Sequence, residues 1–162
     1  MMPDLWIMVA ILFVCVALSA FFSASETAFT SANKVRLKTL AAGGNKRAKL
    51  ALALAEDYDR LLSTILVGNN IVNIAASALA TSLFLALLNG NNGLATTLST
   101  VVMTIVILIF GEVSPKTIAK ESPEKIAIAF APVLRVLRMI IAPVNFFFML
   151  VKKLLHLIFK PA

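Results

Sequence analysis

Three long apolar segments, roughly residues 5–29, 61–88 and 94–118, alternate with polar segments along the chain. Each is long enough to cross a bilayer as a helix, which takes about 20 apolar residues. A short uncharged turn, Asn89 to Gly93, joins the second and third segments. The segment 34–56 instead favours two juxtamembrane helices broken at Gly43-Gly44-Asn45. The pattern predicts an all-α membrane protein with three transmembrane helices, in a single domain over residues 1–162.

The apolar tail, roughly residues 123–160, has a different pattern. On a helical wheel its polar side chains share an arc of about 100°. They are Arg135, Arg138, Asn145, Lys152, Lys153, His156 and Lys160. We therefore expect a juxtamembrane amphipathic helix in the cytoplasmic interface, bent at Pro132 and Pro143. The alternative is a fourth span with arginines that reach the membrane surface, which would move the C-terminus outside.

Composition and charge support a membrane protein and indicate its orientation. The chain is 60% hydrophobic, its mean hydropathy is +0.93 and its net charge is +7. Lys and Arg occur only between the first and second spans and from Lys116, at the end of the third, onward. The positive-inside rule then places the N-terminus outside and the C-terminus in the cytoplasm of a multi-pass protein of the cell (inner) membrane. The positive charge is explained by this topology and by anionic lipid, so no nucleic-acid partner is expected.

Two carboxylates lie at the ends of apolar runs and are candidates for function. Glu26 follows the first run and Glu112 follows the third. A charge in or near the bilayer is costly, so each calls for a partner, and we expect that partner to be a cation. Pro115 has no N–H, so it leaves the Gly111 carbonyl, its helical acceptor, free to bind an ion. With one Cys (Cys15) and one His (His156) in the chain, hard cations with oxygen ligands are favoured.

Polar side chains form stripes on the three predicted spans and supply further oxygens. The stripes are Ser19, Ser23, Glu26 and Thr30; Asn70, Asn73, Ser77 and Thr81; and Thr97, Thr100 and Thr104. A structural role is the alternative, because Ser, Thr and Asn often only join membrane helices. Glu26 could likewise cap a helix or pair with Lys34, and Lys116 could pair with Glu112. An enzyme is not expected, because neither a nucleophile–base pair nor a phosphate-binding loop is evident.

Three motifs, in this order on consecutive spans, resemble the transmembrane domain of the CorC/CNNM family of magnesium transporters. They are Ser-Ala-Ser-Glu-Thr-Ala-Phe (23–29), Val-Gly-Asn-Asn-Ile-Val-Asn (67–73) and Gly-Glu-Val-Ser-Pro-Lys (111–116). The resemblance implies three transmembrane helices, a belt of juxtamembrane helices and a homodimer. It also implies sodium-dependent Mg²⁺ export. Full-length members continue into cytosolic CBS modules that bind ATP, which the 162 residues do not include.

Carried over motif by motif, the resemblance implies an ion site on all three spans. Its metal ligands would come from Ser23, Ser25, Asn70, Asn73, Gly111 (through its carbonyl) and Glu112. Glu26, Asn33 and Asn69 are candidates for outer positions or for a sodium pathway. The substrate would be Mg²⁺, with Na⁺ as the coupling ion. Two other functions remain open: a membrane Mg²⁺ sensor or scaffold without transport, and a transporter of another hard cation, Na⁺ or Ca²⁺.

Overall fold

The computed structural model describes residues 2–160, and the described part is helical with short connections. The helices are α1 (Met2–Ser31), α2 (Lys34–Ala42), α3 (Lys46–Glu56), α4 (Tyr58–Leu87), α5 (Asn92–Val106), the π-helix η1 (Ile107–Val113), α6 (Ser114–Glu121) and α7 (Pro123–Ile158). The predicted all-α fold class is confirmed.

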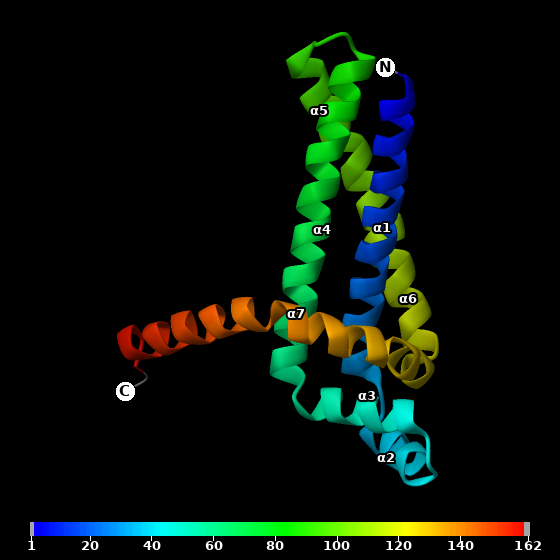
Figure 1. The fold of residues 1–162 in the computed structure, drawn as a ribbon, viewed down its shortest axis with the longest axis vertical. Helices are drawn as coiled ribbons and strands as arrows, with labels where there is room; N and C mark the ends of the chain where they lie inside the picture. Colours follow the sequence, from blue (N-terminus) through cyan, green and yellow to red (C-terminus); the bar gives the residue numbers. More distant parts are fainter. Residues whose placement is uncertain (1, 161–162) are drawn as a thin grey trace.

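Three long rods stand side by side along the longest axis of the molecule (Figure 1). They are α1, α4 and the continuous run Asn92–Glu121, which joins α5, η1 and α6. The rods cover the three predicted spans and extend a few residues beyond most of their ends. The N-terminus and the turn between α4 and α5 lie at one end of the bundle, and the basic hairpin of α2 and α3 lies at the other (Figure 1). The ends of the bundle therefore differ in charge as the sequence predicts.

The tail forms one helix, α7, which crosses the bundle instead of running along it (Figure 1). Pro132 and Pro143 lie inside this helix of 36 residues. By length and composition, α7 is a fourth helix that could cross a membrane. Hydropathy alone therefore does not distinguish the predicted three spans from four. Its polar face partly turns toward α4: Arg138 pairs with Asp57 at 3.6 Å, and the Asn145 amide donates to Thr64 Oγ1 at 3.1 Å.

The hairpin of α2 and α3 forms where the sequence predicts a break. Asn33 and Asn45 each cap the following helix, accepting hydrogen bonds from two backbone N–H groups. Asp57 occupies the N-cap position of α4 without a side-chain capping bond, because its carboxylate faces the guanidinium groups of Arg60 and Arg138.

The largest buried side chains lie at the end of the bundle that carries α3 and α7. Leu37, Leu54, Leu61 and Leu134 are fully buried in one apolar cluster there. Farther along the rods, the buried residues are mostly small, with Ser19, Ser23, Ala76 and Ala80 among them. Small side chains let membrane helices approach closely, whereas the leucine cluster fastens α7 and the hairpin to the bundle.

Gly68 marks the closest approach of α4 to α1. A Cβ at this position would lie 2.3 Å from Cζ of Phe22, whose ring is buried and packs edge-on against Phe21. We expect Gly68→Ala to lower the free energy of unfolding by about 2–3 kcal/mol, because the ring has little room to move. Thermal unfolding in detergent measures this change.

Gly93 provides the matched control for Gly68. It lies near the start of α5, and a Cβ there would meet no atom within 4 Å. Gly93→Ala should therefore be neutral or stabilise the protein by up to about 1 kcal/mol through helix propensity. Equal destabilisation by both substitutions would contradict the close approach at Gly68.

Candidate ion site

The third rod changes its helical geometry at the Gly-Glu pair, residues 111 and 112. Residues Ile107–Val113 form a π-helix, and the Ser114 N–H donates to the carbonyl of Ile109, five residues back. Pro115 follows within the first turn of α6 and has no N–H to donate to the Gly111 carbonyl. The sequence predicts a disturbed helix here, and the structure identifies the disturbance as a π-helix. Such turns are rare and occur frequently at functional sites.

Gly111 is the point where the π-helix approaches α1 most closely. Gly111 is buried, and a Cβ on it would lie 2.9 Å from Oγ of Ser19. A larger residue at either position would push the two backbones apart. The pair therefore brings the backbone of η1 into direct contact with the polar stripe of α1.

Two asparagines of α4 complete this polar cluster. Ser19 Oγ donates to Asn69 Oδ1 at 3.2 Å, and Asn73 Nδ2 forms a long hydrogen bond of 3.5 Å to the same oxygen. The carbonyl oxygen Oδ1 of Asn73 is buried and accepts no hydrogen bond from any of residues 2–160. A buried polar atom without a partner typically costs about 1–3 kcal/mol. It therefore calls for an explanation, and a bound cation would be one.

The structure brings some of the predicted site residues together and separates others. Ser19 contacts Asn69 and Gly111, and Asn69 in turn contacts Asn73. The resemblance does not include Ser19. Ser19 could have been found from sequence, because it begins the stripe that continues to Ser23 and Glu26 at helical spacing. Asn70 is exposed, and the hydrogen bonds that join Ser19, Asn69 and Asn73 do not involve it.

The remaining candidates on the first and third rods lie next to the cluster along the chain. Ser23 is buried one turn along α1 from Ser19. Ser25 is also buried, and its hydroxyl donates to the Phe21 carbonyl at 2.7 Å, so its lone pairs remain available to accept or to coordinate. Glu112 is half-buried in the π-helix beside Gly111.

The two outer candidates, Glu26 and Asn33, have partners of their own. Glu26 Oε2 lies 4.0 Å from the amino group of Lys116 on α6. Lys116 therefore pairs with Glu26 and not with Glu112, the partner considered from the sequence. The other pair considered there, between Glu26 and Lys34, is not formed either. Asn33 uses its side-chain oxygen to cap α2. Neither residue belongs to the cluster around Ser19.

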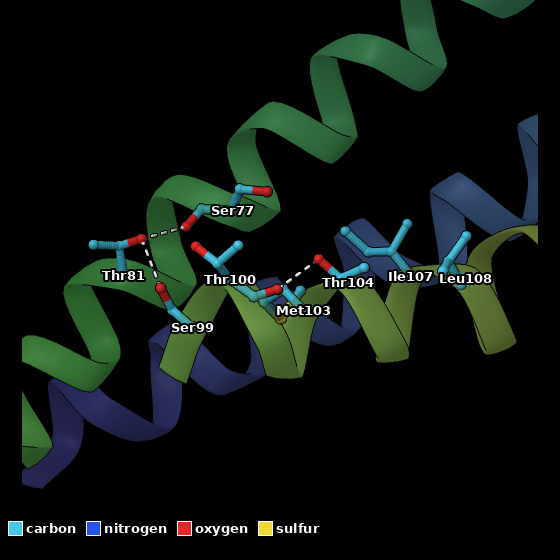
Figure 2. A pocket seen from close by; sticks show the side chains of 8 residues that line it. All are labelled: Ser77, Thr81, Ser99, Thr100, Met103, Thr104, Ile107 and Leu108. Carbon is cyan, nitrogen blue, oxygen red and sulfur yellow. Dashed lines mark hydrogen bonds between the residues drawn. The ribbon is translucent and has the colours of Figure 1, made fainter. Parts of the chain in front are cut away.

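A polar cavity of about 280 Å³ lies between α4 and α5 on the side of the cluster toward the turn that joins them (Figure 2). It is lined by Ser77, Thr81, Ser99, Thr100, Met103, Thr104, Ile107 and Leu108. Thr100 and Thr104 donate their protons to helix carbonyls at 2.7 and 2.6 Å, so their lone pairs remain free. A neighbouring cavity shares Ser77 and Thr81 and includes Asn73. Hydroxyl oxygens thus continue from the cluster toward the end of the bundle that carries the turn between α4 and α5.

The available donor atoms favour a hard cation. Among residues 2–160 there is no group of three or more His, Cys, Asp or Glu side chains able to hold a metal. The cluster instead offers amide, hydroxyl and backbone carbonyl oxygens, with one carboxylate beside it. Mg²⁺, Ca²⁺ and Na⁺ take oxygen ligands of this kind, whereas Zn²⁺ prefers nitrogen and sulfur.

The long apolar rods and the polar cluster enclosed between them define a multi-pass helical membrane protein. The chain belongs to the family described as the cyclin M (CNNM) transmembrane N-terminal domain, whose model matches residues 10–161. The resemblance seen in the sequence motifs is confirmed at the level of the family.

Three relatives illustrate the similarity. A UPF0053 protein of Haemophilus influenzae is 46% identical over 133 residues, which cover 82% of this chain. The UPF0053 inner membrane protein YfjD of Escherichia coli is 44% identical over 78% of the chain. A chloroplastic DUF21 domain-containing protein of Arabidopsis thaliana is 38% identical over 72%. The matched regions span only 31%, 29% and 17% of these longer proteins.

Proposed function

We propose that this domain transports Mg²⁺ across the membrane, as a homodimer that exports Mg²⁺ in exchange for Na⁺. The observation that carries the proposal is the buried, unpartnered Oδ1 of Asn73 in a cluster with Ser19, Asn69 and Gly111. A cation there would satisfy this oxygen. The family of membrane domains to which the chain belongs is consistent with a transporter.

The ligands would come from all three rods. Asn73 Oδ1 on α4, the Gly111 carbonyl on η1 and a serine hydroxyl of α1 (Ser23 or Ser25) supply neutral oxygens. The Glu112 carboxylate supplies negative charge. Mg²⁺ demands near-octahedral geometry and gives up water reluctantly, so a site that holds it without water needs several rigid oxygens. The close contacts at Gly68 and Gly111 bring the three rods, and with them these oxygens, near one another.

The orientation of α7 supports three spans in each protomer. Because α7 crosses the bundle near the end with the basic hairpin, it lies where a cytoplasmic membrane surface would cut the rods (Figure 1). Its exposed apolar residues, which include Phe146, Phe147 and Leu154, would enter the lipid interface. The N-terminus would then lie outside and the C-terminus in the cytoplasm, in the inner membrane.

The hydroxyl-bearing cavity between α4 and α5, and the neighbouring one on α4, support a dimer. Ser77 and Thr100 are exposed on rods that would face lipid in an isolated protomer. A second protomer would cover these hydroxyls, and Ala78 beside Ser77 would permit close contact. The covered hydroxyls would form an outward route for the ion, and the π-helix offers a turn that could rearrange as access alternates.

The test is Na⁺-driven Mg²⁺ efflux from proteoliposomes that contain only this protein. Glu112→Gln keeps the shape of the side chain but removes its charge, so we expect it to lower the efflux rate at least tenfold. Glu121→Gln removes the same charge at the exposed last residue of the third rod, nine positions along the chain from Glu112, and should leave the rate unchanged.

Two outcomes would favour the alternative functions. Mg²⁺ binding without efflux would support a sensor or scaffold, or would mean that transport requires parts of the longer relatives. Binding in which Ca²⁺ or Na⁺ displaces Mg²⁺ at lower concentration would support a transporter of that cation. Equal efflux in wild type and Glu112→Gln would contradict the role of this carboxylate.

A further inference from the structure

A separate cavity of about 1020 Å³ lies where the C-terminal half of α7 passes the beginning of α4. Its lining combines cationic and apolar side chains. The basic residues are Arg60, Lys152, Lys153, His156 and Lys160, and the large apolar residues are Phe148, Met149 and Leu157. This half of α7 extends beyond α4 and away from the rods (Figure 1). The cavity is therefore distinct from the ion site in position and in chemistry.

The charge in this cavity is predominantly positive. Four Lys and Arg residues line it against two acids, Asp57 and Asp59. Asp57 is already engaged by Arg60 and Arg138 at 3.8 and 3.6 Å. Within residues 2–160, neither Lys152 nor Lys153 forms an ion pair. Two adjacent cations thus face a cavity with apolar walls and lack an anionic partner in the described chain.

Asn145 presents a buried acceptor at the same place. Its Oδ1 is buried and unpartnered in the described part of the chain, and the residue is 7% exposed. Hydrogen bonding fixes which way the amide points. Thr64 donates its hydroxyl proton to the Arg60 carbonyl at 3.0 Å, so Thr64 can only accept from Asn145 Nδ2. The Oδ1 atom must therefore face away from Thr64, and it calls for a ligand that carries a donor.

We propose that this cavity binds one anionic phospholipid of the cytoplasmic leaflet whose headgroup carries a hydroxyl. The phosphate would lie between Arg60 and the lysines of α7, and a headgroup hydroxyl would donate to Asn145 Oδ1. The acyl chains would pass along Phe148 and Met149 into the membrane. The proposal rests on the orientation given above, in which α7 lies at the cytoplasmic surface. It assigns to α7 a specific lipid contact beyond general attraction to anionic membranes.

The test compares lipids of equal acyl chains by their effect on thermal unfolding of the protein in non-ionic detergent. Phosphatidylglycerol, which has phosphate and hydroxyls, should raise the unfolding temperature more than zwitterionic phosphatidylcholine does. Phosphatidylmethanol, equally charged but without a headgroup hydroxyl, should raise it less than phosphatidylglycerol. Soluble glycerol 3-phosphate should have no effect at the same concentration, because it lacks the acyl chains.

A pair of lysine variants separates this site from general charge effects. We expect Lys152→Ala/Lys153→Ala to bind phosphatidylglycerol about thirty-fold more weakly, roughly five-fold for each lysine. Lys46→Ala/Lys49→Ala removes the same charge from the exposed side of α3 and should bind as wild type does. Equal weakening in both pairs, or equal stabilisation by the soluble phosphate, would overturn the proposal.

The ion site is measured on the same samples. Mg²⁺ titration should give the wild-type response in Lys152→Ala/Lys153→Ala, because these lysines lie outside the cluster around Ser19. A protein that binds phosphatidylglycerol selectively but shows no Mg²⁺ response would refute the proposed transport function and leave the lipid site standing. A Mg²⁺ response without lipid selectivity would refute the lipid site alone.

Discussion

Asn73→Leu is expected to abolish Mg²⁺ binding while leaving the protein at least as stable as wild type. Leucine is larger than asparagine but has the same branched side chain of four heavy atoms and no carbonyl, so the substitution removes the buried Oδ1 that has no hydrogen-bond partner within residues 2–160. In the absence of Mg²⁺, the free energy of unfolding should be unchanged or higher by about 1 kcal/mol, since an unmet polar atom disappears. The affinity for Mg²⁺ should fall by at least about 100-fold.

Thermal unfolding measured with and without Mg²⁺ checks both halves of this prediction. In the wild type Mg²⁺ should raise the unfolding temperature, and in Asn73→Leu it should not. Asn70→Leu gives the comparison on the same helix, and its exposed side chain predicts a smaller loss. If Asn73→Leu unfolds at a much lower temperature than wild type and still responds to Mg²⁺, the asparagine is a structural bridge between helices and not a ligand.

Gly111→Ala is expected to weaken Mg²⁺ binding strongly by forcing the π-helix away from α1. The added Cβ would lie 2.9 Å from Ser19 Oγ, closer than such atoms can approach. The overpacking should cost about 1–3 kcal/mol of stability, and it should shift the Gly111 carbonyl together with the backbone of η1 away from α1. Isothermal titration with MgCl₂, together with thermal unfolding, measures the two effects.

Exchanging the two residues tests whether the contact itself is responsible. In Ser19→Gly/Gly111→Ala the new Cβ would face the space that Ser19 leaves, and its next neighbour, Cγ2 of Ile107, is at an ordinary 3.5 Å. We expect stability to return close to wild type and Mg²⁺ affinity to recover in part, because the ligand from residue 111 is a backbone carbonyl. A double variant that remains as unstable as Gly111→Ala would rule out the close approach as the cause.

The distribution of side-chain size favours a bundle whose helices are tightly packed at one end and can move relative to one another near the middle. Large leucines gather under α3 and α7, where they hold the hairpin and the crossing helix against the rods. Around the ion site the helices meet through serine, alanine and glycine. Contacts of small residues bury little apolar area, so a rearrangement of the rods there disrupts less packing than one at the leucine cluster.

The sequence predicted the helices well because their signals are local. Apolar runs of membrane length specify the rods, and the pair of capping asparagines, Asn33 and Asn45, together with the glycines before Asn45, delimits the hairpin. The sequence also indicated the disturbance at Gly111, since proline removes a specific hydrogen bond. It could not predict a π-helix, because a missing N–H at residue 115 does not specify which neighbouring N–H groups bond five residues back instead of four.

The sequence did not determine which residues of different helices contact one another. Glu26 pairs with Lys116, not with the nearby Lys34, because α1 and α6 lie side by side. Asn145 belongs to a polar stripe on the wheel of α7, yet α4 buries it against Thr64. Helical spacing tells which residues share a face of one helix, but it does not tell which face of another helix lies opposite.

The sequence by itself determined a helical membrane domain, its three rods, the separation of basic residues to one end and the chemical type of the candidate ligands. Each of these depends on residue type and spacing along one helix, which the chain carries without reference to its fold. Only the tertiary structure decided that Ser19 joins Asn69 and Gly111, that Asn73 is left with an unmet oxygen and that α7 crosses the rods. The contacts of Ser19 and Asn73 depend on the distance between the rods, which the close contacts at Gly68 and Gly111 limit, and the position of α7 depends on the leucine cluster that holds it against the bundle.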